Sequence, residues 1–178
     1  MANAEPLPVK ARPTVTPDGE FIDPRIHGVV IHYRVPVEDE RGELVEIYNP
    51  AWGIDNAPLV YCYHSTIRSS RLKGWVVHKL QDDRLFLIQG VVRIALFDNR
   101  KDSPTYRMLN KFVTSERHRA LVIIPRGVYH AVQNIGRTDA TFVNLPTRPY
   151  NHADPDKHVL PVKNNLIPFA FDDEDAYE

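Results

Sequence analysis

Cysteine is nearly absent from this 178-residue sequence, which contains only Cys62. A single thiol cannot form an internal disulfide, so the chain is not a disulfide-stapled secreted domain and fits a reducing compartment. No apolar run approaches the roughly 20 residues that a bilayer-spanning helix needs. A basic segment followed by an apolar core, typical of a secretory signal, is missing at the N-terminus. We therefore predict a cytoplasmic protein that does not contact the membrane.

An excess of charge of either sign is also missing. Lys and Arg total 22 and Asp and Glu total 23, which gives a formal net charge of −1. Such a chain lacks the positive field that attracts nucleic acid or an anionic membrane surface, so we predict neither as a partner. Glycine is modest at 8 residues, whereas proline is frequent at 15. Rigid turns between short β-branched runs favour many strands over long helices.

The length fits a single domain that can bury a substantial core. Residues 1–27 are polar and interrupted by prolines, and we predict an N-terminal arm. Residues 28–165 carry the apolar runs and form the predicted β domain. Residues 166–178 end in an acidic run and are predicted to be a solvated tail.

Short apolar or alternating runs recur through the central part of the chain, and each predicts a strand. Closely spaced short strands are typical of a sandwich or barrel. The Gln89-Gly90 corner directly joins two of them, so residues 84–88 and 91–97 are predicted to form a hairpin. The predicted strands are 28–35, 43–48, 58–67, 75–78, 84–88, 91–97, 106–113, 120–124, 128–133 and 140–145.

The most informative stretch is a corner between two of these strands, at residues 124–134. Pro125 fixes φ and cannot sit in a central ladder, and Gly127 permits a backbone conformation that other residues resist. After the corner the side chains alternate, so Tyr129 and His130 lie on opposite faces of the sheet. The spacing Pro-x-Gly-x-x-His-x-x-x-Asn is similar to the second motif of the cupin β-barrels. In that resemblance His130 points into the barrel; the alternative is a half-buried corner histidine without a function.

Three segments in order resemble the dTDP-4-dehydrorhamnose 3,5-epimerase family of the cupin superfamily. They are Asp-Glu-Arg-Gly-Glu-Leu-Val-Glu at 39–46, Asp-Asn-Arg-Lys-Asp-Ser-Pro-Thr-Tyr at 98–106, and Ile-Pro-Arg-Gly-Val-Tyr-His at 124–130. A Pro-Tyr-Asn run at 149–151 looks like the ending of some members. The resemblance implies an all-β jelly-roll cupin barrel (a double-stranded β-helix), a homodimer, and a nucleotide-linked 4-keto-6-deoxy sugar as ligand, with no cofactor.

The resemblance also implies a reaction. In the family a histidine removes the proton beside the ketone, a lysine stabilises the enolate, and a tyrosine returns a proton from the opposite face. Here Val76, Asp83 and Asn144 stand at those three positions. His78 follows Val76 by two residues and therefore faces the same side of the strand. We predict that His130 and His78 move protons and that Asp83 orients or polarises one of them, while Asn144 contacts the substrate.

The resemblance further suggests substrate-binding residues. Arg41 corresponds to a phosphate contact, for which a planar guanidinium is well suited. Glu46 would lie near the base or ribose, and Lys73 stands where the family has a phosphate-binding arginine. Tyr129 and Tyr150 are candidates for stacking on a base or sugar.

A different chemistry remains open in the same barrel. Metal-binding cupins use a His-x-His pair, an acid four or five residues later, and a histidine on a later strand. His78, Asp83 and His130 keep three of these four positions, and Val76 replaces the fourth. Three ligands with open positions suit a divalent metal. The alternatives to an epimerase or isomerase are thus a metal-dependent cupin enzyme acting on another small molecule and a non-catalytic barrel that binds a sugar nucleotide.

Overall fold

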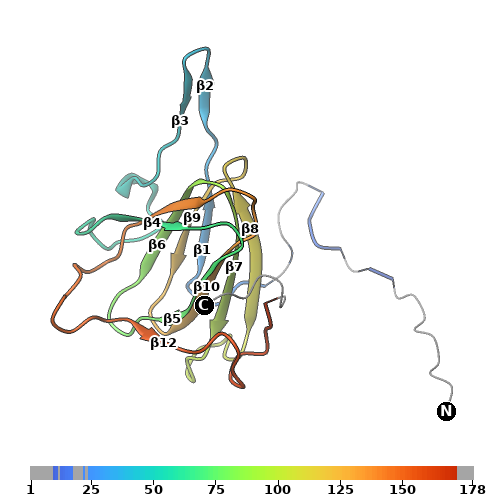
Figure 1. The fold of residues 1–178 in the computed structure, drawn as a ribbon, viewed down its shortest axis with the longest axis vertical. Coiled ribbons are helices and arrows are strands. Elements are labelled where there is room, and N and C mark those ends of the chain that lie inside the picture. The colour runs from blue at the N-terminus through green and yellow to red at the C-terminus, as the bar shows by residue number, and fades with distance from the viewer. Residues whose placement is uncertain (1–9, 12, 18–21, 23, 172–178) are drawn as a thin grey trace.

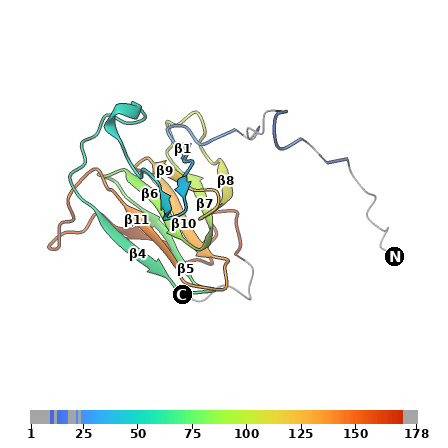
Figure 2. The same cartoon turned by 90° about the horizontal axis from the view of Figure 1, so that it is seen from above.

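The structure of this chain is a computed structural model that describes residues 10–11, 13–17, 22 and 24–171. Two five-stranded antiparallel sheets form the two layers of the molecule (Figures 1 and 2). This confirms the predicted all-β class, although each sheet keeps two free edges and the layers do not close into a continuous barrel. Much of the predicted arm and the end of the predicted tail lie outside the described residues. Within these residues, none of the helices has the length and apolar character needed to cross a membrane.

Strands from distant parts of the sequence alternate within each sheet. The first sheet has the order β1 (Val30–Tyr33), β9 (Ala120–Ile124), β6 (Asp83–Gln89), β11 (Ala140–Asn144) and β4 (Tyr63–Ile67). The second has the order β12 (His158–Val159), β5 (Leu72–Val77), β10 (Val128–Asn134), β7 (Val91–Asp98) and β8 (Leu109–Ser115). A separate hairpin of β2 (Val37–Asp39) and β3 (Gly42–Leu44) projects beyond the sheets, and a 3₁₀ turn, η1 (Pro50–Trp52), follows it (Figure 1).

The predicted hairpin between residues 84–88 and 91–97 is wrong. β6 pairs with β9 and β11, whereas β7 pairs with β10 and β8 in the other sheet. Gly90 lies where the chain crosses between the layers, at φ +95°, and a Cβ there would lie 2.8 Å from the Ala140 Cα. β6 and β7 are adjacent in sequence but do not pair with each other. Each buries its apolar face by packing against the opposite sheet.

The predicted strand at 43–48 is also shorter than expected, because β3 ends at Leu44. The predicted strand at 58–67 begins only at Tyr63, and the two-residue strand β12 lies in the stretch after residue 146 that was expected to be irregular. The strands predicted at 120–124 and 128–133 are confirmed as β9 and β10. Both are buried along their whole length or nearly so, and such strands give the strongest apolar runs.

Two apolar clusters hold the layers. The first lies between the sheets and includes Leu85, Val122 and Val132. The second contains Trp75, Phe97 and Ala131, with Ile167 and Phe171 of the C-terminal segment packed against them. Trp75 and Val76 are consecutive in β5, so the C-terminal segment covers one face of this strand while the other face turns toward the interior.

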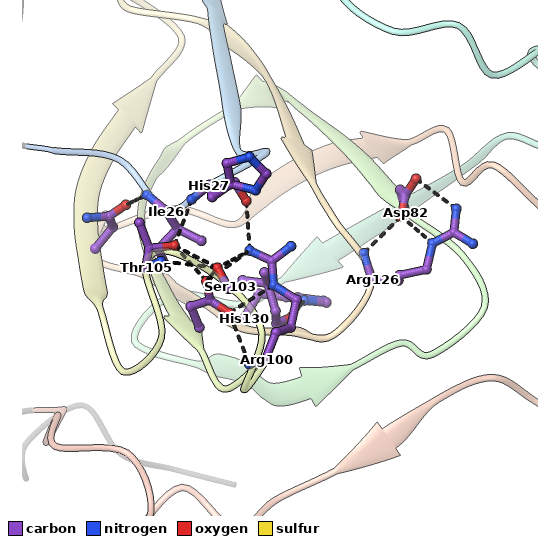
Figure 3. Close-up of polar contacts among 11 residues, drawn as sticks. Ile26, His27, Asp82, Arg100, Ser103, Thr105, Arg126 and His130 are labelled. Carbon is purple, nitrogen blue, oxygen red and sulfur yellow. Dashed lines mark hydrogen bonds and ion pairs between the residues drawn. The ribbon is translucent and has the colours of Figure 1, made fainter.

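A polar cluster ties the end of β7 to the N-terminal segment (Figure 3). The buried Asp98 carboxylate accepts hydrogen bonds from the Arg100 guanidinium at 2.8 and 2.9 Å and from the Ser103 and Thr105 hydroxyls at 2.5 and 2.7 Å. Arg100 also donates to the main-chain oxygen of His27 at 2.7 Å. The Ser-Pro-Thr turn that contributed to the family resemblance is thus structural, because the hydroxyls of Ser103 and Thr105 both donate hydrogen bonds to the Asp98 carboxylate.

Candidate functional site

A cavity of about 490 Å³ is lined by residues of both sheets and by the segment after β11. Pockets of a few hundred cubic ångströms are the usual size for small ligands and cofactors. His78, Asp83 and His130, which the sequence suggested for one site, all line this cavity, and their roles stay a prediction. They come from the residue after β5, the first residue of β6 and the third residue of β10.

Asp83 lies between the two histidines. Its Oδ2 is 3.3 Å from the Nε2 of His78 and 3.5 Å from the Nε2 of His130. The centroids of the two imidazole rings are 5.5 Å apart, and the ring planes are inclined by 30°. Asp83 is only 3% exposed, so its charge is shielded little by solvent. The other carboxylate oxygen, Oδ1, accepts a hydrogen bond from the Gln81 side chain at 3.0 Å.

Main-chain oxygens orient both histidines. The Nδ1 of His78 contacts the main-chain oxygen of Asp156, and the Nδ1 of His130 lies 3.4 Å from that of Val128. The Asp156 carboxylate accepts hydrogen bonds from three successive main-chain N–H groups, at residues 79, 80 and 81, at 2.7 to 3.1 Å. Asp156, in the segment between β11 and β12, therefore holds both the His78 ring and the turn that leads to Asp83.

An ion pair joins the corner before β10 to the turn before β6 (Figure 3). Arg126 donates to Asp82 through its main-chain N–H at 2.8 Å and through its guanidinium at 3.0 and 3.2 Å. The pair holds the segment that precedes His130 against the segment that precedes Asp83. Sequence reasoning did not identify Asp82, Arg126 or Asp156, because their partners lie more than 40 residues away in the chain.

The cluster separates the pKa values of its two histidines. Burial lowers the pKa of His130 below the usual 6.5, and the attraction of Asp83 does not compensate for it. Burial also acts to lower the pKa of His78, but the hydrogen bond and charge of Asp83 and the carbonyl of Asp156 raise it above 6.5. Burial disfavours the Asp83 carboxylate, yet the histidines hold the pKa of Asp83 at about 2. Burial thus favours the neutral form of His130, which can act as a base, whereas Asp83 and Asp156 favour the protonated form of His78.

Three of the predicted binding residues also line the cavity: Lys73, Asn144 and Tyr150. The Lys73 ammonium donates to the Ser65 hydroxyl at 2.7 Å, and burial together with the nearby Lys157 lowers the pKa of Lys73. Asn144 is 1% exposed and lies on β11.

The other three predicted binding residues do not line the cavity. Arg41 lies at the exposed turn of the β2–β3 hairpin and pairs with Asp39 at 2.5 Å. Glu46 pairs with Arg34 at 3.1 Å. Tyr129 packs with the cluster around Trp75, on the face of β10 opposite His130. A contact of any of these residues with the substrate stays a prediction.

Comparisons with known proteins agree with the resemblance that the motifs suggested. The family model described as dTDP-4-dehydrorhamnose 3,5-epimerase matches residues 23–167. A curated relative from Haloferax volcanii, "Probable low-salt glycan biosynthesis epimerase", is 30% identical over 139 residues, which cover 78% of this chain and 89% of that protein.

Solved structures show the same fold at lower identity. The dTDP sugar isomerase of Desulfovibrio desulfuricans has a TM-score of 0.74 at 22% identity, covering 82% of this chain and 91% of that one. A double mutant of a 3′-monoepimerase from Streptomyces bikiniensis, in complex with dTDP, has a TM-score of 0.72 at 21% identity, covering 85% and 78%.

Proposed function

This chain belongs to the dTDP-4-dehydrorhamnose 3,5-epimerase family, and from that premise we propose that it is an epimerase or isomerase of a nucleotide-activated 4-keto-6-deoxy sugar. The relatives named above act on or bind dTDP sugars or dTDP, or are named as epimerases. The observation that carries the proposal is the His130–Asp83–His78 cluster in a cavity that reaches Lys73.

Removing a proton next to a ketone needs a base that is unprotonated near neutral pH and a donor or cation for the developing enolate. His130 meets the first requirement because burial lowers its pKa and favours the neutral imidazole. His78 next to it supplies positive charge when it is protonated, the form that Asp83 favours by raising the pKa of His78. Asp83 keeps the two rings in place and balances the charge of His78. Lys73 stands on the cavity wall as a point charge for the diphosphate.

The test is deuterium uptake by dTDP-4-keto-6-deoxyglucose in heavy water, followed by mass spectrometry. The wild-type protein is expected to exceed the enzyme-free rate, and His130→Gln should lower uptake about 10²–10⁴-fold, the usual contribution of a general base. Binding of dTDP, measured by calorimetry, should persist. His64→Gln is the matched control because His64 is exposed on β4, outside the residues that line the cavity. No uptake by the wild type would contradict the proposal.

One observation favours a second candidate, a metal-dependent cupin enzyme. One ligand atom each from His78, Asp83 and His130 lie within 4.8 Å of one another. Each histidine turns Nδ1 toward a main-chain oxygen and Nε2 toward Asp83, the orientation usual for metal-ligating histidines. The donor set fits a divalent metal, which when bound would polarise a substrate oxygen.

Metal content separates the two candidates. The protein is stripped with EDTA and then titrated with Zn²⁺, Mn²⁺ or Fe²⁺, and bound metal and the melting temperature are measured. Stoichiometric binding that Asp83→Asn abolishes would favour the metal enzyme. Deuterium uptake that survives EDTA would favour the histidine base.

We also propose that the protein is a cytoplasmic homodimer. The projecting β2–β3 hairpin supports the dimer, because it exposes Val35, Val37 and Leu44, which a partner would cover. Light scattering coupled to size exclusion gives the mass, and a monomer at micromolar concentration would contradict this part of the proposal.

A further inference from the structure

A tyrosine hydroxyl reaches the cavity from the sheet that does not contain His130. Tyr63 is the first residue of β4 in the first sheet, whereas His130 lies on β10 in the second sheet. Both residues line the same cavity. A ligand in this cavity would therefore meet the imidazole from one sheet and the phenol from the other.

Asn144 determines how this hydroxyl is used. Asn144 and Tyr63 are directly opposed in the pairing of β11 with β4. The Oδ1 of Asn144 accepts the main-chain N–H of Arg84 at 3.1 Å, which fixes the orientation of the amide. Its Nδ2 consequently donates to the Tyr63 hydroxyl oxygen at 2.9 Å.

A hydroxyl that accepts this bond keeps its own hydrogen for another partner. Among the described residues, none accepts a hydrogen bond from the Tyr63 O–H. Burial, helped by the charge of Asp83, raises the pKa of Tyr63 and outweighs the opposing bond from Asn144. The group is therefore protonated at neutral pH, and its hydrogen is available to a ligand.

We propose that Tyr63 is the catalytic acid that returns a proton to the substrate carbon on the face opposite His130. The inference rests on the function proposed above. His130 takes the proton as the C–H bond breaks, and the electron pair remains as the enolate. The Tyr63 O–H bond then breaks as a new C–H bond forms on the other face. Water reprotonates the phenolate and removes the proton from His130, so the carbon is inverted and the protein is restored.

The arrangement explains how the chain can work with Asn144 on β11, where the family resemblance placed a tyrosine. Asn144 binds the hydroxyl of the neighbouring strand instead of supplying one. A base without a donor on the second face would exchange the proton but restore the same configuration, so inversion specifically requires the second group.

The experiment compares exchange with inversion in Tyr63→Phe, using dTDP-4-keto-6-deoxyglucose in heavy water. Deuterium in recovered substrate reports proton removal, and NMR of the sugar reports inverted product. Tyr63→Phe is expected to form inverted product about 10²–10⁴-fold more slowly, the usual contribution of a general acid. It should still incorporate deuterium into uninverted substrate. Calorimetry with dTDP and a melting curve show that the variant is folded and binds nucleotide.

Tyr61→Phe is the matched control, because its ring lies 5.7 Å from that of Tyr63 and it makes no hydrogen bond to Asn144. The inference is overturned if Tyr63→Phe inverts the sugar within about threefold of the wild type, or if both tyrosine variants lose the same activity. It is also overturned if Tyr63→Phe binds dTDP but loses exchange and inversion together, since the phenol would then act before proton removal. If the wild type itself exchanges nothing, the proposed function fails, and the role of Tyr63 fails with it.

Discussion

At the scale of single residues, two histidines that contact the same buried carboxylate have pKa values shifted in opposite directions. Asp83 contacts both Nε2 atoms at similar distances, yet the pKa of His78 is raised and that of His130 is lowered. The difference comes from the balance of effects at each ring: burial prevails at His130, whereas at His78 the hydrogen bond and charge of Asp83, together with Asp156, outweigh burial. Neighbouring groups whose pKa values are shifted apart are suited to separate acid and base roles.

Arg84, the residue after Asp83, is a buried charge whose donors are paired with acceptors. Arg84 is fully buried and donates to the Asp55 carboxylate at 2.5 Å and to the Ala57 carbonyl at 2.6 Å. Arg84→Met would leave Asp55 without its partner, and we expect the free energy of unfolding to fall by about 3–5 kcal/mol in urea titrations.

Arg126→Met is the matched control for that measurement, since the side chains of its pair with Asp82 are 56% and 26% exposed, against 0% and 12% for Arg84 and Asp55. It should cost less than about 1 kcal/mol. Equal losses in the two variants would contradict the importance of burial at Arg84.

At the scale of elements, the loop between β7 and β8 couples stability to pH. The Asp98 side chain is buried, and bonds from Arg100, Ser103 and Thr105 outweigh this burial and hold the pKa of Asp98 well below the usual 3.8. A carboxyl whose pKa is depressed by folding stabilises the protein above the unfolded value and loses this contribution as pH falls. The stabilisation is therefore complete above about pH 4 and declines below it.

Asp98→Asn is expected to lower the free energy of unfolding at pH 7 by about 1–3 kcal/mol, because buried donors lose a charged acceptor. The difference between the variant and the wild type should shrink toward pH 3 in urea titrations. A difference that stays constant from pH 7 to pH 3 would show that Asp98 acts through packing and not through its charge.

At the scale of the whole molecule, the C-terminal segment is part of the packed structure. Trp75 is fully buried, and its ring lies 5.6 Å from that of Phe171. Ile167 joins the same cluster. The domain limit expected at residue 165 stays a prediction, but this packing leads us to expect a later one.

Truncation tests where the domain ends. Ending the chain after residue 165 removes Ile167 and Phe171, and each fully buried apolar side chain contributes about 1.5–3 kcal/mol. We expect a loss of about 3–6 kcal/mol in urea titrations. Ending it after residue 171 is the control, which should change little. Equal stability of the two truncated chains would place the limit at 165.

The sequence by itself determined the all-β class, most strands and the family, and it singled out His78, Asp83 and His130 as candidates. These follow from alternation, turn residues and motif spacing, all of which are local patterns. The tertiary structure alone decided that β6 and β7 lie in different sheets, that Tyr63 meets Asn144, and that Asp156 holds His78. The two contacts join residues 78 or more positions apart in the chain. The placement of β6 and β7 depends on which sheet buries each strand better, and burial is a property of the whole core.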